Sequence, residues 1–161
     1  MTLEMNDEGS LTPDASQYLT FTLKEEEFGI EILRVQEIKG ISHITPIPNM
    51  PEHIKGVMNL RGAVVPIIDL RSKFSMPETP YNRFTVIIVV TIGDKITGLV
   101  VDAVSDVLNI EGSNIEPADK LGVGCDAYYL SGIAKNGERL ITLLDMEKLV
   151  SFDEHDLQTA T

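Results

Sequence analysis

The amino-acid sequence predicts an all-β protein, made of two similar five-stranded barrels of the SH3-like or OB-like kind packed together. Two observations support this fold class. From residue 17 to about residue 145, short apolar segments rich in β-branched residues alternate with turn residues, and the pattern of these segments occurs twice. Helical periodicity is weak, so we expect only short helices, at connections and near the C-terminus.

Four segments are the clearest strand candidates. Turn residues separate them, among them Gly93-Asp94, Asn136-Gly137 and the prolines that precede Ile54. The strand candidates are residues 18–23, 64–68, 84–92 and 139–144.

Two aspartates stand at matching places, each between an apolar strand and a short helix candidate. Asp69 directly precedes a helix candidate at residues 70–74. Asp145 is the first residue of a second helix candidate, at residues 145–152. Catalytic carboxylates often stand at strand ends, but an aspartate before a helix is also an ordinary N-cap. Because one active site rarely needs the same group twice, we interpret both residues as caps.

An internal repeat relates the two halves of the chain. Residues 18–38 align with residues 87–107 at a constant offset of 69. This alignment places Gly29 on Gly98 and Glu37 on its counterpart Asp106. Chance similarity between apolar strands is the alternative, but glycines and acidic residues coincide as well as hydrophobic ones.

A second alignment extends the repeat. Residues 56–70 match residues 132–146 at an offset of 76, so the copies span roughly residues 18–70 and 87–146. A small sheet removes its edges best by closing on itself, and a copy of this size buries little surface alone. We therefore expect two barrel subdomains that share contacts.

The apolar alternation changes phase after Ile32, and again after Val101 in the second copy. A strand that changes phase must bend or bulge. Bends at equivalent places are expected to create a cleft or an exposed apolar rim near Glu37 and Asp106.

Charge and composition exclude several classes of function. The net charge is −12, and residues 1–16 and 151–161 contain acidic residues but no lysine or arginine, so we expect two flexible acidic tails around a domain of residues 17–150. Nucleic acid is not an expected partner, because no basic stripe is present. No run is apolar enough for direct membrane insertion, and no secretory signal is visible. The single cysteine suits the cytoplasm.

Enzymatic chemistry is not expected either. His43, His53 and His155 have no metal-ligand spacing, and Cys125 lies in a glycine-rich loop far in sequence from every histidine. We therefore expect no catalytic residue, no cofactor and no metal site.

Residues 56–62 are predicted to form the turn of a hairpin with Arg61 at its tip. The second copy has Lys135-Asn136-Gly137-Glu138 at this place, so the basic tip is particular to the first copy. Arg61 is either a solvated turn residue or an interface anchor, a role that suits arginine. We expect it to pair with Glu37 or to reach a carboxylate of a partner.

Three motifs carry a resemblance to a known family. They are FGIEILRVQEI (28–38), HIKGVMNLRGAVVPIIDLR (53–71) and ITGLVVDAVSDVL (96–108). The chain resembles the CheW family of chemotaxis coupling proteins over residues 17–149. The resemblance implies two intertwined barrels and an adaptor that links the cytoplasmic hairpin tip of a chemoreceptor to the regulatory domain of the histidine kinase CheA, at membrane-associated receptor arrays.

The resemblance also implies where the partners bind, with a receptor helix lying in an apolar groove between the subdomains. Ile38 is added as an apolar anchor, and Gly56 and Gly98 are expected to act through the backbone. The expected interface residues are Val35, Glu37, Ile38, Gly56, Asn59, Leu60, Arg61, Gly62, Gly98 and Val107. Two alternatives stay open: an adaptor of another receptor–kinase pathway, such as surface sensing or twitching motility, and a small β-barrel ligand-binding protein or enzyme.

Overall fold

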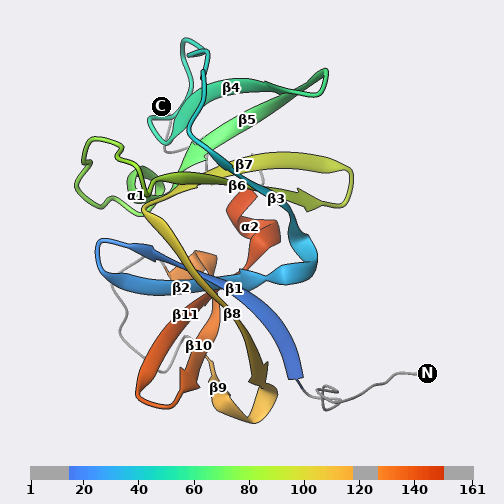
Figure 1. The fold of residues 1–161 in the computed structure, drawn as a ribbon, viewed down its shortest axis with the longest axis vertical. Coiled ribbons are helices and arrows are strands. Elements are labelled where there is room, and N and C mark those ends of the chain that lie inside the picture. The colour runs from blue at the N-terminus through green and yellow to red at the C-terminus, as the bar shows by residue number, and fades with distance from the viewer. Residues whose placement is uncertain (1–14, 118–126, 151–161) are drawn as a thin grey trace.

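The computed structural model describes residues 15–117 and 127–150, which form two β-sheets with a few short helices (Figure 1). Sheet A has six strands in the order β8-β1-β2-β11-β10-β9, and sheet B has five in the order β3-β6-β7-β5-β4. The predicted all-β class with two similar units is confirmed. Sheet A exceeds the expected five strands because a two-residue strand, β9, is added at its edge.

The strands have the following bounds: β1 Ala15–Leu23, β2 Glu26–Glu31, β3 Val35–Gly40, β4 Ile54–Leu60, β5 Ala63–Asp69, β6 Val86–Ile92, β7 Lys95–Val101, β8 Ala103–Glu111, β9 Ile115–Glu116, β10 Leu130–Asn136 and β11 Arg139–Leu144. The α-helices are α1 Leu70–Lys73 and α2 Met146–Val150, and the 3-10 helices are η1 Ile32–Arg34, η2 Gly112–Asn114 and η4 Ala127–Tyr129.

Some boundaries differ from the expected ones. Strand β1 starts at Ala15, so two residues assigned to the N-terminal tail belong to the sheet; residues 1–14 of that tail lie outside the described residues. Strand β6 starts at Val86 rather than at residue 84, because residues 82–85 form a turn in which the Asn82 side chain accepts a hydrogen bond from the Phe84 backbone N–H. The C-terminal tail, residues 151–161, and Cys125 also lie outside the described part.

Each sheet combines strands from both copies of the repeat. The first hairpin, β1–β2, joins β8 to β11 in sheet A, whereas the corresponding second hairpin, β6–β7, joins β3 to β5 in sheet B (Figure 1). The two copies have therefore exchanged their first hairpins. Neither sheet can form without strands from both halves of the chain.

The pairing registers of the two sheets match at the offsets of the sequence repeat. In sheet A, β11 and β2 run parallel and Leu143 pairs with Gly29. In sheet B, β5 and β7 run parallel and Ile67 pairs with Gly98. These pairs are related by the offsets of 76 and 69 found in the sequence. The parallel contact that joins each exchanged hairpin to its sheet is thus the same in both.

The bulges also repeat. The β4–β5 register shifts between Ile54 and Gly56, and the β10–β11 register shifts between Leu130 and Gly132, which are the same positions at an offset of 76. Bulges bend a strand and increase its twist. Both sheets are consequently curved at equivalent places.

Three apolar clusters fill the interior. One cluster belongs to sheet B and includes Leu60 and Ile67, and one belongs to sheet A and includes Ile141 and Leu143. The largest cluster lies between the sheets and takes side chains from both, together with α1 and α2. Since apolar burial is the dominant favourable term in folding, this shared cluster ties the two sheets into one unit.

Candidate functional site

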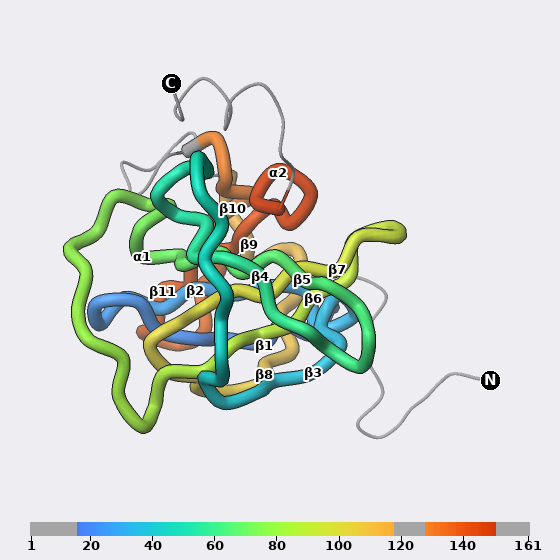
Figure 2. Tube along the Cα trace, turned by 90° about the horizontal axis from the view of Figure 1, so that it is seen from above, coloured from blue at the N-terminus to red at the C-terminus, as the bar shows by residue number. Residues whose placement is uncertain are grey.

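Strands β3 and β8 are edge strands that carry four of the ten expected interface residues, and five more lie on the β4–β5 hairpin. Each is the outermost strand of its sheet, and the two are counterparts in the repeat. Seen from above, both run along the same side of the molecule, at the lower edge of the view (Figure 2). These two strands supply one edge of each sheet to the site, and the tip of the β4–β5 hairpin supplies the rest.

The two predicted bends lie where each of these strands begins. The first is the 3-10 helix η1, followed by a register shift between Val35 and Glu37 against β6. The second is at Asp102, the single residue between β7 and β8. Both bends are confirmed. They bring the chain from one sheet to the other, which is why the interface strands lie beside the junction between the sheets.

Apolar side chains are exposed at equivalent places on the two edges. Ile38 on β3 is 44% exposed, and Val107 on β8, its counterpart at an offset of 69, is 51% exposed. Val35 is half-buried and packs against the shared cluster. Ile38 and Val107 are thus free to contact a partner, while Val35 also serves the core.

Arg61 lies at the tip of the β4–β5 hairpin, as predicted. Arg61 and Gly62 both have positive φ, 51° and 89°, as a type I′ two-residue turn requires. The Asn59 side-chain oxygen accepts a hydrogen bond from the Gly62 backbone N–H at 3.0 Å and closes the turn. Asn59 and Gly62 therefore shape the tip, and the Arg61 side chain extends from it, 63% exposed.

The expected pairing of Arg61 with Glu37 is confirmed. Nη2 of Arg61 lies 2.5 Å from Oε2 of Glu37. The hydrogen bond from Arg61, aided by the positive charges of Arg61 and Lys39, lowers the pKa of the Glu37 carboxyl below its usual value. An exposed ion pair contributes little to folding, so this contact orients the arginine more than it stabilises the chain.

Three of the expected interface residues are in the interior. Leu60 is buried in the cluster of sheet B, and Gly56 and Gly98 are also buried. Gly56 has φ of +147°, and a Cβ there would lie 2.1 Å from the Thr45 carbonyl oxygen. A Cβ at Gly98 would lie 2.7 Å from Cδ1 of Ile67. The two glycines allow close packing around the backbone, Leu60 packs in the core, and none of the three presents a side chain to a partner.

A second arginine–carboxylate arrangement, which the sequence analysis missed, is present on sheet A. Arg139 donates two hydrogen bonds to Glu27, from Nε at 2.9 Å and from Nη2 at 2.6 Å, and its Nη2 also lies 3.2 Å from Asp106. Asp106 is the counterpart of Glu37. The sequence signal was an arginine directly after the tip of the β10–β11 hairpin, rather than at the tip as in the β4–β5 hairpin.

Other exposed apolar residues were also missed. Leu33 in η1 is 95% exposed, and Val64 on β5 and its counterpart Leu140 on β11 are 69% and 63% exposed. Side chains along β5 alternate between the two faces of the sheet. Since Val65 and Ile67 are buried on one face, the sequence pattern could have placed Val64 on the opposite, exposed face.

Asp69 and Asp145 cap the helices, as predicted. The Asp69 carboxylate accepts hydrogen bonds from the backbone N–H groups of Arg71 and Ser72. The Asp145 carboxylate accepts one from the backbone N–H of Lys148 at 3.2 Å.

Within residues 15–117 and 127–150, no group of three or more His, Cys, Asp and Glu side chains is placed to hold a metal ion. In the same part of the chain, no helix is long and apolar enough to cross a membrane.

Two intertwined sheets with exposed apolar residues and an oriented arginine along their edges define a small all-β module suited to binding other proteins. Comparison with known proteins identifies the family to which this module belongs. Residues 17–154 match the CheW-like domain.

Individual relatives cover most of the chain. The chemotaxis protein CheW of Klebsiella aerogenes is 49% identical over 138 residues, which span 86% of this chain and 83% of the relative. The probable chemotaxis protein CheW of Rhizobium etli is 37% identical over 148 residues, 91% of this chain and 95% of the relative. The crystal structure of the scaffolding protein TtCheW from Thermoanaerobacter tengcongensis superposes with a TM-score of 0.77 at 35% identity, covering 81% of this chain and 88% of that one.

The chain belongs to the CheW family. It is a chemotaxis scaffold that couples receptors to the kinase CheA, and an adaptor rather than an enzyme. This assignment removes the alternative of a small β-barrel enzyme or ligand-binding protein.

Proposed function

We propose that this adaptor binds the cytoplasmic hairpin tip of chemoreceptors and the regulatory domain of CheA through the edges of its two sheets. The observation that carries the proposal is the pairing of Arg61 with Glu37 beside β3, together with exposed Ile38 and Val107 at equivalent places on β3 and β8. The adaptor works in the cytoplasm, at membrane-associated receptor arrays.

The receptor contact is a helix lying against the two edge strands. Ile38 and Val107 supply apolar anchors, one from each sheet, and an amphipathic helix matches such a pair with its own apolar face. Val35 lies behind them, packed against the shared cluster. Polar groups around the anchors then set the register of the helix.

Arg61 provides the polar contact. An exposed arginine already oriented by a carboxylate loses less side-chain freedom on binding than an unrestrained one, which favours its use as an anchor. Because Glu37 binds Nη2 of Arg61, the Nε and Nη1 groups can donate hydrogen bonds to a partner carboxylate or carbonyl. Removal of such an arginine affects binding far more than folding.

A three-component co-sedimentation assay tests the proposal. Receptor-tip fragments are attached to vesicles, and soluble CheA and the adaptor are added alone and together. We expect the adaptor to sediment with receptor tips and to bring CheA with it. An adaptor that binds neither component, or CheA sedimentation that does not depend on the adaptor, contradicts the proposal.

The pathway served is a separate question with a separate test. A deletion strain that fails to spread on swarm plates, and spreads again when the gene is restored, supports flagellar chemotaxis. A deletion that affects only surface sensing or twitching motility supports the alternative pathway.

A further inference from the structure

The two sheets are joined by a polar network centred on Asp102, the residue between β7 of sheet B and β8 of sheet A. The Asp102 backbone N–H donates a hydrogen bond to the carbonyl oxygen of Thr22 at 3.1 Å. Oδ2 of Asp102 accepts a hydrogen bond at 2.9 Å from the backbone N–H of Lys24, in the turn between β1 and β2. Asp102 thus contacts the exchanged hairpin of sheet A through both its backbone and its side chain.

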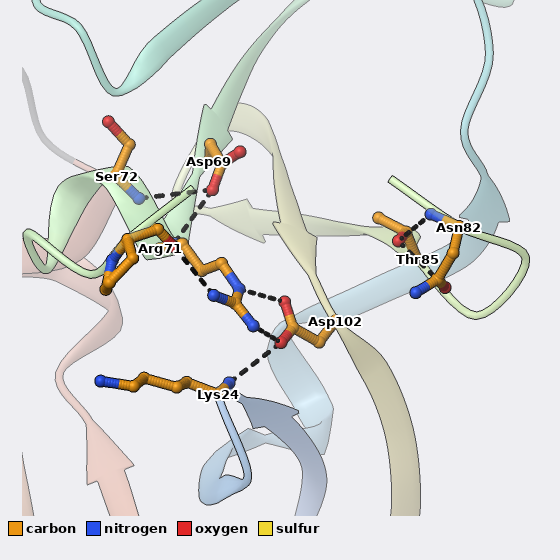
Figure 3. A network of polar contacts seen from close by, with 8 residues as sticks. Lys24, Asp69, Arg71, Ser72, Asn82, Thr85 and Asp102 are labelled. Carbon is orange, nitrogen blue, oxygen red and sulfur yellow. Dashed lines mark hydrogen bonds and ion pairs between the residues drawn. The ribbon is translucent and has the colours of Figure 1, made fainter. Parts of the chain in front are cut away.

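Arg71 of helix α1 approaches the same carboxylate from the sheet B side (Figure 3). Its Nε donates to Oδ1 of Asp102 at 2.8 Å, and its Nη2 donates to Oδ2 at 2.5 Å. The Arg71 side chain is 14% exposed and that of Asp102 is 29% exposed. A bidentate arginine–carboxylate pair with this little exposure is directional, because both groups must keep one geometry to retain two hydrogen bonds.

Arg71 is itself held in place on sheet B. Its Nη1 donates to the Pro77 carbonyl oxygen at 2.8 Å, and its backbone N–H donates to Asp69 at 3.0 Å. The Tyr81 hydroxyl donates to the other oxygen of Asp69 at 2.7 Å. The α1 helix and the segment that follows it therefore hold Arg71 at the junction between the sheets.

The corresponding junction in the first copy has no such residue. At an offset of 69, the counterpart of Asp102 is Leu33, which lies in η1 and is 95% exposed. A leucine side chain cannot form an ion pair. Of these two equivalent crossovers, only the second is fixed by a side-chain salt bridge at this position.

We propose that Arg71 and Asp102 form an intersheet latch, and that they are positioning residues that fix the orientation of sheet A relative to sheet B. The shared apolar cluster keeps the sheets together, but apolar contact is non-directional and packed elements can slide over one another at small cost. Two hydrogen bonds between a guanidinium and a carboxylate, with the carboxylate bound to a turn of sheet A, resist such sliding.

The latch has a consequence for binding that rests on the proposed function. Ile38 and Arg61 belong to sheet B, whereas Val107 belongs to sheet A. Val107 lies on β8, which starts directly after Asp102, five positions along the chain from that residue. A partner helix that contacts both edges needs them at one fixed separation. The latch presets that separation and so lowers the cost of binding.

Distance measurements on the isolated adaptor test the latch directly. In a background in which Cys125 is replaced by Ser, spin labels are attached at Asp94→Cys, in the exposed β6–β7 turn of sheet B, and at Glu138→Cys, in the exposed β10–β11 turn of sheet A. We expect Asp102→Asn to shift and broaden the distance distribution between the labels. A distribution identical to that of the parent overturns the latch.

The matched control is Glu78→Gln. Glu78 lies in the segment after α1 and pairs with Lys55 of β4 at 3.1 Å, so this variant also removes an ion pair, but one that does not reach sheet A. Its distance distribution should equal that of the parent; broadening equal to that of Asp102→Asn overturns a specific role for the latch. If Asp102→Asn does not fold, Arg71→Lys keeps the charge and loses the bidentate geometry, and an unchanged distribution in that variant overturns the proposal.

A binding assay separates the latch from the proposed function. Asp102→Asn should weaken binding of receptor-tip fragments by about fivefold, the lower end of usual coupling between sites, while Glu78→Gln binds as the parent does. Unchanged binding overturns the consequence for recognition, even if the sheets move. A parent protein that binds no receptor tip overturns the proposed function but leaves the distance result to decide the latch.

Discussion

The Nη2 atom of Arg61, at the tip of the β4–β5 hairpin, lies 2.5 Å from Oε2 of Glu37 on β3. The pair joins the two opposite edges of sheet B, because Glu37 lies on β3 and Arg61 directly follows β4. The contact orients an exposed arginine beside the strand that carries Ile38. The predictions below follow from this arrangement and from the placement of the remaining site residues.

Arg61→Ala should leave the fold intact and abolish coupling. The melting temperature should stay at the parent value, because the pair is exposed, whereas binding of the partner should weaken about thirtyfold or more, as for other interface arginines. Kinase activation in a reconstituted receptor–kinase mixture measures the loss. Arg83→Ala, which removes another exposed arginine outside the site, is the control and should activate normally. Full activation by Arg61→Ala would remove Arg61 from the interface.

Val107→Met should weaken receptor binding without unfolding the protein. The side chain is 51% exposed, so a larger residue fits in the free protein but obstructs a helix docked on β8. Pull-down on receptor-tip fragments and a thermal melt measure the two effects. Leu140→Met, at a residue 63% exposed on β11, is the control and should bind normally. A Val107→Met protein that melts far below the parent would place Val107 in the core instead.

Gly56→Ala should destabilise the fold strongly. Its Cβ would lie 2.1 Å from the Thr45 carbonyl oxygen, so the backbone of residue 45 has to move, and we expect a loss of about 3 kcal/mol or more in the free energy of unfolding. Gly93→Ala is the matched control, because φ there is also positive, +62°, but nothing lies within 4 Å of the new Cβ. Its expected cost is about 1 kcal/mol. Equal stability of the two variants in urea titrations would contradict this account of Gly56.

The stability contribution of Asp102 should disappear in acid. Burial opposes ionisation of its carboxyl, but the hydrogen bonds from Arg71 and the Lys24 backbone N–H outweigh burial and lower the pKa of Asp102 below its ordinary value of 3.8. The unfolded chain therefore binds more protons near that pH, so the contribution is complete at and above about pH 5 and is lost as the pH falls through the folded-state pKa.

Urea titrations from pH 7 to pH 2.5 measure this effect. The difference in the free energy of unfolding between the parent and Asp102→Asn should stay constant at and above pH 5 and shrink in acid. A difference that is the same at every pH would show that the Asp102 charge does not contribute.

Much of the site could be predicted because its signals are local. The hairpin tip follows from a motif of seven residues, 56–62, and the repeat alignment located the bends after Ile32 and Val101. The pairing of Arg61 with Glu37 was expected because the hairpin and the bend were placed on the same rim. Caps at Asp69 and Asp145 were predicted from their position before short helices.

Other features depend on tertiary contacts that no local pattern carries. The exchange of hairpins was implied by the family resemblance alone, because identical copies pair equally well with their own hairpin or with the other one. Arg139 and Glu27 are 112 residues apart, and Arg71 and Asp102 are 31 residues apart. Leu60 was expected at the interface because it lies within the Arg61 motif, but its phase on β4 points it into the core.

The rate of CheA autophosphorylation, measured with vesicle-bound receptor tips and increasing amounts of the adaptor, tests the central claim most directly. We predict that the rate rises only when receptor, kinase and adaptor are all present, and that it does not rise when Arg61→Ala replaces the parent adaptor. A rate that is independent of the adaptor, or that rises equally without receptor tips, would contradict the claim that this protein couples receptor to kinase.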